Sequence, residues 1–120
     1  MAEIKSEKLN SRLLLETAVA AVREKQGRDL AVFDVRRFSS VTDYQLVVSA
    51  LSTPHIKALY NAVRLAVKDS GGLCCHKSGE PDSGWIVADY LDVVMHFFDQ
   101  DTRRRYALDE LWADVPRVEI

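Results

Sequence analysis

The chain has 120 residues, of which 48% are hydrophobic and 28% charged, and its formal net charge is −2. These values are typical of a globular domain and exclude a disordered or fibrous chain. The apolar runs fall far short of the ~18 residues that a membrane-spanning helix needs. The N-terminal segment shows neither a secretory nor a transit-peptide pattern, so we expect one domain over residues 1–120, located in the cytoplasm.

The first half of the chain predicts a helix followed by two strands. Leucine, alanine and valine recur at near-helical spacing over residues 8–26, and Gly27 is placed to end this helix in the left-handed conformation. Residues 30–35 and 44–51 are short, mainly apolar runs that suit buried strands.

A second helix follows the second strand. Ser52 or Thr53 can cap it, Pro54 fits its first turn, and Gly71-Gly72 ends it. Its apolar stripe consists of Ile56, Leu59, Tyr60, Val63 and Val67. A stripe of this width must be buried against another layer.

The last third predicts a strand at residues 73–76, a loop at 78–83, a hairpin at 84–98 and one or two short helices within 100–113. The order α-β-β-α-β-β-β-α indicates the α/β (α+β) class. We expect a mixed five-stranded sheet with helices packed on it.

The hairpin segregates two kinds of side chain. A Tyr90-Leu91 turn would pair Asp89 with Asp92. Because side chains alternate along a strand, one face then carries Trp85, Val87, Asp89, Asp92, Val94 and His96. The opposite face carries Ile86, Ala88, Val93, Met95 and Phe97, which is typical of a core. The first face predicts a docking surface or a small polar site.

A single tryptophan is more often a core residue than a binding residue, and a single histidine is more often a satisfied sheet residue than a titrating group. Asp89 and Asp92 favour the other interpretation for Trp85. Two carboxylates on its face would need paired charges if they were buried, so we expect this face to be exposed.

The cysteines, Cys74 and Cys75, are adjacent and offer no disulfide framework, as expected in a reducing compartment. A zinc site would combine Cys74 or Cys75 with His76, and His96 is a further candidate ligand, but no second cysteine-rich knuckle supports it. Buried strand cysteines are the favoured interpretation, and we expect neither a metal nor a cofactor.

Charge is unevenly distributed along the chain. Residues 1–79 hold 12 basic and 8 acidic residues, whereas residues 80–120 hold 4 basic and 10 acidic ones. A partner that docks on the last third should therefore be basic, and direct contact with nucleic acid should be small. The run Arg103-Arg104-Arg105 is expected to be a solvated helix face.

Residues 85–98 follow the pattern W-x-x-x-D-Y-x-D-V-V-x-H-x-F. Thr42-Asp43-Tyr44 precede this segment, and Tyr106 and Leu111-Trp112 follow it. This combination resembles the ribosomal silencing factor RsfS, or Iojap-like, family. The resemblance covers nearly the whole chain and places the core at about 8–115. It implies a nucleotidyltransferase-like topology without catalysis. It also implies binding to protein fourteen of the large ribosomal subunit, which blocks joining of the small subunit and represses translation under nutrient limitation. A role in ribosome assembly is a further implication.

Two positions depart from the family pattern. Leu91 stands where a glycine is usual in the D-Y-G-D turn, and Ala50 replaces a glycine that commonly follows the serine of the second strand. A residue other than glycine at positive φ costs roughly 1 kcal/mol or more, so the Leu91 turn is expected to be of another type or one residue longer.

Blocking the small subunit by steric occlusion requires that the protein bind the large subunit at the right place, but it requires no covalent chemistry. Trp85 would be the anchor, with Val87 and Val94 beside it. Asp89 and Asp92 would pair with basic residues of the partner. Tyr90 and His96 would donate or accept hydrogen bonds, which completes the expected partner-binding set.

Two other functions stay open. A nucleotidyltransferase needs a Gly-Ser phosphate loop and an Asp-x-Asp pair, but Gly71-Gly72 is followed by Leu-Cys-Cys, and Asp89 and Asp92 are three residues apart. We therefore expect no enzymatic activity. A self-associating scaffold, including a homodimer, is the other alternative, because an exposed hairpin can pair with its own copy.

Overall fold

The computed structural model describes residues 10–72 and 76–120, and a five-stranded sheet lies at its centre. The strands are β1 (Arg28–Asp34), β2 (Tyr44–Ala50), β3 (His76–Ser78), β4 (Trp85–Asp89) and β5 (Val93–Asp99), in the order β1-β2-β5-β4-β3. The central strands β2 and β5 are parallel, and all other neighbours are antiparallel. The predicted mixed sheet and order of elements are confirmed.

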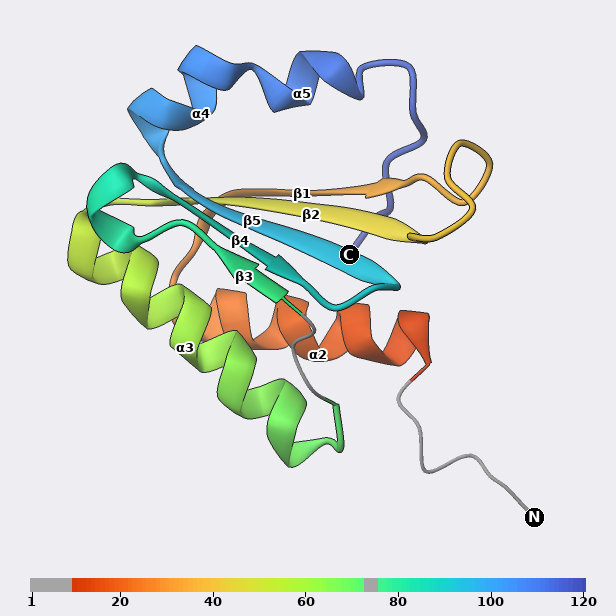
Figure 1. The fold of residues 1–120 in the computed structure, drawn as a ribbon, viewed down its shortest axis with the longest axis horizontal. Coiled ribbons are helices and arrows are strands. Elements are labelled where there is room, and N and C mark those ends of the chain that lie inside the picture. The colour runs from red at the N-terminus through yellow and green to blue at the C-terminus, as the bar shows by residue number, and fades with distance from the viewer. Residues whose placement is uncertain (1–9, 73–75) are drawn as a thin grey trace.

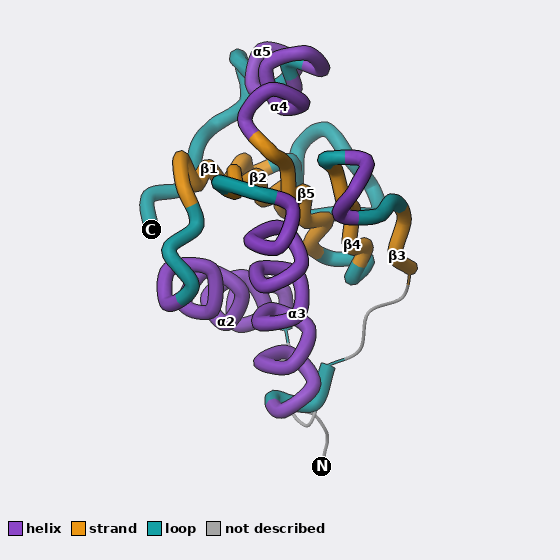
Figure 2. Tube along the Cα trace, turned by 90° about the vertical axis from the view of Figure 1, so that its left-hand side faces the viewer, coloured by secondary structure: helices purple, strands orange, loops and turns teal. Residues whose placement is uncertain are grey.

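Helices cover both faces of the sheet (Figure 1). Below it in this view lie α2 (Ser11–Glu24) and α3 (Thr53–Asp69), and above it lie α4 (Gln100–Tyr106) and α5 (Leu108–Leu111). Figure 2 shows the same separation from the side, with the sheet between the two helical layers. No helix in the described parts of the chain is long and apolar enough to cross a membrane.

Capping side chains fix where the two long helices begin. The side chain of Asn10 accepts a hydrogen bond from the Leu13 amide at 2.8 Å, and Ser52 accepts one from the His55 amide at 3.2 Å. These bonds satisfy amides that have no partner within the helix. Ser52, rather than Thr53, is thus the cap of α3.

The end of α2 differs from the prediction. Gln26, with φ 62°, takes the left-handed conformation that was expected of Gly27. Gly27 is needed for space instead, because a Cβ there would lie 2.6 Å from methyl groups of both Val22 and Val48. The glycine therefore lets α2 pack closely on β2.

The apolar side chains form two cores. The larger core lies between the sheet and the helices α2 and α3 and includes Ile56, Leu59, Val63 and Val67 of the predicted stripe. The smaller core lies under α4 and α5, where Ala31, Phe33, Val35, Val47 and Phe98 are buried and Trp85, Leu108, Trp112 and Val115 pack against them. The C-terminal helices are therefore part of the fold.

The C-terminal tail follows the outer edge of β1. The Asp34 amide donates to the Pro116 carbonyl at 2.8 Å, and the Val118 amide donates to the Val32 carbonyl at 2.9 Å. Arg23 of α2 donates to the backbone oxygen of Ile120 at 2.6 Å. The tail thereby protects one edge of the sheet from pairing with another chain.

The third strand is described over His76–Ser78, and its pairing with β4 places His76 opposite Asp89. Of the predicted strand at residues 73–76, residues 73–75 lie outside the described parts of the chain. The interpretation of Cys74 and Cys75 as buried strand residues lies outside the described residues. The following loop contains a short 3-10 helix, η1 (Pro81–Ser83).

Candidate functional site: an aromatic face under the C-terminal helices

The turn between β4 and β5 is Leu91-Asp92 rather than Tyr90-Leu91. Asp89 lies opposite Val94, so the predicted pairing of Asp89 with Asp92 is wrong. Two bonds explain the shift. Asp89 Oδ1 accepts from the Leu91 amide at 2.8 Å, and the Asp92 carbonyl accepts from the Asp43 amide at 2.8 Å. The second bond ties Asp92 to the loop before β2, and the turn forms with Leu91 at φ 70°.

The partner of Asp89 moves by two residues, from Asp92 to Val94, and because side chains alternate with a period of two, the predicted faces survive. Ile86, Ala88, Val93, Met95 and Phe97 are all at most 1% exposed and form part of the larger core. Tyr90 lies with this set and is 6% exposed. Tyr90, expected to form a hydrogen bond with the partner, thus lies in the core beneath the sheet.

The opposite face is less open than expected. Trp85 is half-buried, and its ring lies 4.8 Å from that of Phe98 and 4.7 Å from that of Tyr106, centroid to centroid. His96 is only 8% exposed, and the Trp112 ring lies 5.7 Å from it. The sequence did not predict that α4 and α5 would fold back and cover this part of the hairpin.

Both nitrogens of the His96 ring have partners inside the protein. The Trp85 indole N–H donates to His96 Nδ1 at 3.3 Å, and His96 Nε2 lies 2.9 Å from Gln45 Oε1. Burial lowers the pKa of His96 to about 4. His96 is therefore a satisfied sheet histidine, and the expected hydrogen bond from His96 to a partner is not available in this arrangement.

The exposed part of the face surrounds these buried groups. Val87, Asp89 and Val94 are half-buried, whereas Asp92 is exposed. A pocket of about 300 Å³ opens beside Trp85, and its lining consists of Ser78, Gly79, Ser83, Trp85, Val87, Thr102, Arg105 and Tyr106. The structure thus places Trp85, Val87, Asp89 and Val94 on one face of the hairpin, with Asp92 in the turn at its end. We call Trp85, Val87, Asp89, Asp92, Val94 and Tyr106 the docking face.

Tyr106 is the functional candidate that spacing alone did not assign to this face. It is 52% exposed and packs on the Trp85 ring from α4. Its signal in the sequence is an aromatic residue in a polar helical tail, but that pattern does not say where the tail folds back. Leu111 is 68% exposed, whereas Trp112 packs on the fold, with its ring 5.3 Å from that of Phe33.

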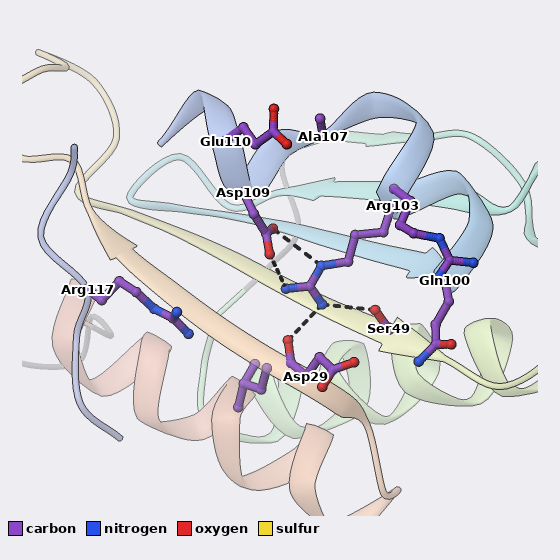
Figure 3. Close-up of a pocket in the computed structure, with 10 residues that line it drawn as sticks. Asp29, Ser49, Gln100, Arg103, Ala107, Asp109, Glu110 and Arg117 are labelled. Atoms are coloured by element: carbon purple, nitrogen blue, oxygen red, sulfur yellow. Dashed lines mark hydrogen bonds and ion pairs between the residues drawn. The ribbon is translucent and has the colours of Figure 1, made fainter. Parts of the chain in front are cut away.

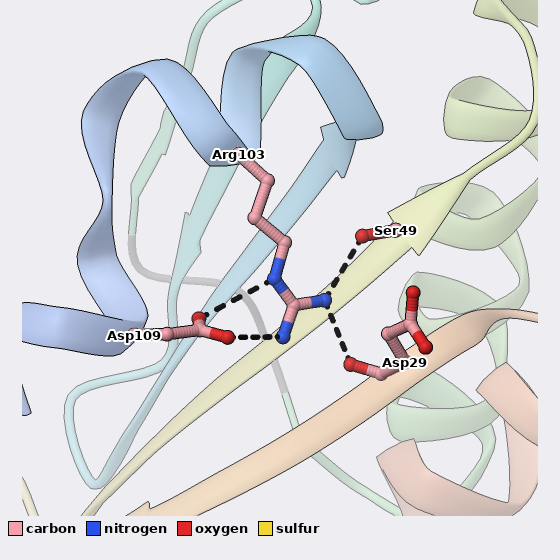
Figure 4. A network of polar contacts seen from close by, with 4 residues as sticks. All are labelled: Asp29, Ser49, Arg103 and Asp109. Atoms are coloured by element: carbon pink, nitrogen blue, oxygen red, sulfur yellow. Dashed lines mark hydrogen bonds and ion pairs between the residues drawn. The ribbon is translucent and has the colours of Figure 1, made fainter. Parts of the chain in front are cut away.

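Arg103 fixes the C-terminal helices over the sheet (Figure 4). Its Nη1 donates to the Asp29 carbonyl at 2.7 Å and to Ser49 Oγ at 2.9 Å, and its Nη2 donates to Asp109 at 3.0 Å. The Arg103 side chain is 11% exposed, so the expectation of a solvated arginine run is wrong for this residue. Arg104 and Arg105 are exposed, as expected.

The Arg103 side chain crosses a cavity of about 650 Å³ between the C-terminal helices and the β1–β2 side of the sheet (Figure 3). Figure 3 shows Asp109 and Ser49 on opposite sides of its guanidinium group. Nε, Nη1 and Nη2 of Arg103 each donate to an oxygen of this chain. The cavity is a structural junction, distinct from the docking face.

Comparison with known proteins decides the family. The model of the family "Ribosomal silencing factor during starvation" (RsfS) matches residues 8–120. The chain belongs to the RsfS family. The ribosomal silencing factor RsfS of Bacillus subtilis is 29% identical over 112 residues, which are 93% of this chain and 95% of that protein. A mouse protein named "Mitochondrial assembly of ribosomal large subunit protein 1" is 27% identical over 110 residues, covering 87% of this chain and 47% of its own length.

Solved structures agree with this membership. A crystal structure of a Chromobacterium violaceum protein matches with a TM-score of 0.83 and 25% identity, covering 87% of each chain. A Bacillus halodurans protein matches with a TM-score of 0.80 and 28% identity, covering 91% of this chain and 99% of its own. The predicted family and fold class are confirmed. In this RsfS-family chain, no cluster of three or more metal-ligating side chains occurs within residues 10–72 and 76–120.

Proposed function

We propose that this RsfS-family protein binds protein fourteen of the large ribosomal subunit through the docking face and blocks joining of the small subunit. Membership of a family of ribosomal silencing factors makes it a ribosome-associated regulator of translation. The observation that carries the finer proposal is the arrangement of the docking face, where the aromatic pair Trp85 and Tyr106 lies at the start of β4 and half-buried Asp89 and exposed Asp92 lie toward the turn.

Such a face suits a basic protein partner better than RNA. Residues 80–120 hold 10 acidic and 4 basic residues, which would repel a phosphate backbone and attract lysine and arginine. A protein–protein interface of about 800 Å² per partner, centred on an aromatic residue, is sufficient for stable binding. Silencing then follows from occupancy alone, and the mechanism requires no catalytic group, metal or cofactor.

Asp89 also has a role within the fold. Because its Oδ1 accepts from the Leu91 amide, removing this carboxylate would disturb the turn as well as the docking face. Asp92 is exposed and its side chain takes no part in the turn bonds given above. Asp92 is therefore the cleaner position at which to test charge.

The test is co-sedimentation with purified large ribosomal subunits, comparing the wild type with Trp85→Ala and Asp92→Lys. We expect each variant to weaken binding about tenfold, as for an interface anchor or a matched charge pair. Asp69→Lys is the matched control, because Asp69 is an exposed carboxylate at the end of α3, on the other side of the sheet. Folded wild-type protein that fails to sediment with the subunits would refute the proposal.

A light-scattering assay of subunit joining separates occlusion from simple binding. Adding the protein to large subunits before small subunits should lower the amount of joined ribosomes. Binding without this effect would favour a role in assembly of the large subunit, which the name of the mouse relative suggests. Sedimentation of the free protein as a dimer that Trp85→Ala dissociates would instead favour the self-associating scaffold.

A further inference from the structure

Three side chains from three neighbouring strands form a line of hydrogen bonds beneath the docking face. Gln45 lies on β2, His96 on β5 and Trp85 on β4. In the strand registers, Val94 pairs with Gln45, and Phe98 pairs with Trp85, so both partners lie diagonally across from His96. Diagonal neighbours on one face of a sheet are within reach of long side chains.

The bonds fix the direction of the line. An indole N–H can only donate, so His96 Nδ1, which lies 3.3 Å from Trp85 Nε1, must be the unprotonated nitrogen. His96 Nε2 then carries the proton and donates to Gln45 Oε1 at 2.9 Å. Gln45 thereby sets the tautomer of His96, and His96 sets the orientation of the indole.

The tryptophan is held by two ring contacts as well as at its N–H. Its ring packs against that of buried Phe98 and against that of exposed Tyr106 on α4. We propose that Gln45 and His96 are positioning residues that hold Trp85 in the orientation needed to bind its partner. This inference rests on the proposed function and adds Gln45, which is half-buried, to the residues that determine it.

The arrangement also limits the chemistry of the contact. Because the indole N–H is used inside the protein, Trp85 offers ring surface and no donor. The partner group that fits such a surface beside acidic residues is an apolar side chain or the stem and cation of a lysine or arginine. A hydrogen-bond acceptor of the partner would find no donor on Trp85.

The experiment combines nitrogen-15 NMR with the co-sedimentation assay. Gln45→Met removes the acceptor with little change of shape, Gln45→Glu keeps an acceptor oxygen, and Gln100→Met alters an exposed glutamine as the control. The spectrum of Trp85→Phe identifies the Trp85 indole resonance. We expect Gln45→Met to shift this resonance and to weaken binding about tenfold. Gln45→Glu should shift the resonance less and bind more tightly than Gln45→Met. Gln100→Met should change neither the resonance nor the binding.

An indole resonance unchanged in Gln45→Met, or binding unchanged while that resonance moves, would overturn the inference. The wild type gives an independent check that needs no variant. Its His96 ring should show a protonated Nε2 and an unprotonated Nδ1, and the opposite tautomer would also overturn the inference. A wild type that shows the expected tautomer and indole coupling but does not bind subunits would refute the proposed function while leaving the internal line of bonds established.

Discussion

Leu91 shows how one residue can carry backbone strain in an exposed turn. Its φ of 70° lies in the left-handed region that favours glycine, and its side chain is 51% exposed. Burial of the Leu91 side chain therefore offsets little of the free-energy cost of the strained backbone. The sequence indicated the conflict at this position, but the structure resolves it by straining Leu91 and moving the turn rather than by lengthening it.

Leu91→Gly should raise the free energy of unfolding by up to about 1 kcal/mol, because glycine adopts positive φ without a steric penalty. Leu91→Ala removes the same side chain but keeps the penalty, so it should give no gain. Urea denaturation of the three proteins measures the difference. Equal stabilities of the glycine and alanine variants would show that the turn stores no strain.

His96 links stability to pH. Its pKa falls from an ordinary 6.5 to about 4 on folding, so the unfolded chain takes up a proton at a pH where the folded protein does not. The contribution of His96 to the free energy of unfolding is therefore fully present above pH 6.5. It is lost as the pH falls toward about 4, by roughly 3 kcal/mol in total. Urea denaturation of the wild type and of His96→Phe across this range should give a shallower loss of stability for the variant. Parallel pH profiles would contradict this assignment.

At the scale of the elements, Arg103 is the residue that holds α4 and α5 on the sheet. Its guanidinium group bonds to Asp109 just beyond α4, to Ser49 on β2 and to Asp29 on β1 (Figure 4). The planar fork of arginine can satisfy these three directions at once, whereas a lysine cannot. Arg103 therefore provides a polar attachment of these helices to β1 and β2.

Arg103→Lys should lower the free energy of unfolding by about 1–3 kcal/mol, because the buried Ser49 hydroxyl and two more exposed acceptors lose the guanidinium donors. It should also increase the cleavage of residues 100–113 in limited proteolysis. Arg104→Lys is the matched control, since the ion pair of Arg104 with Asp101 is 74% and 83% exposed and such pairs contribute little. Equal proteolysis of the two variants would mean that apolar packing alone holds the helices.

Local patterns predicted the elements well and their spatial relations less well. The caps and stripe of α3 and the two faces of the hairpin follow from residue types at fixed spacing. The cover over His96, the interior position of Arg103 and the burial of Tyr90 depend on where α4 and α5 fold back and on the exact turn. Those are contacts between segments far apart in sequence, and no local spacing encodes them.

At the scale of the whole molecule, charge is separated between the two parts of the chain. The excess of acidic residues after position 79 places negative charge in the part of the chain that supplies the docking face. Attraction between such a face and a basic partner acts over about one Debye length, which is ~8 Å at physiological ionic strength. Long-range attraction of this kind chiefly raises the association rate.

The association rate with large subunits should therefore fall as potassium chloride is raised at constant magnesium, with a smaller change in the dissociation rate. Asp92→Lys should show a weaker dependence on salt than the wild type, and Asp69→Lys a dependence close to that of the wild type. Stopped-flow fluorescence of Trp85 reports both rates. A salt-independent association rate would argue that the docking face is recognised by shape alone.

The parallel pairing at the centre of the sheet has a consequence during synthesis. Tyr44 of β2 pairs with Val93 of β5, so the middle of the sheet joins the two halves of the chain. While the protein is being translated, α2, β1, β2 and α3 leave the ribosome before their central partner strand exists. The apolar surfaces of these elements stay exposed until β5 emerges. Contacts between segments so far apart in sequence also form slowly. The nascent chain is thus most vulnerable to aggregation just before its last quarter is made.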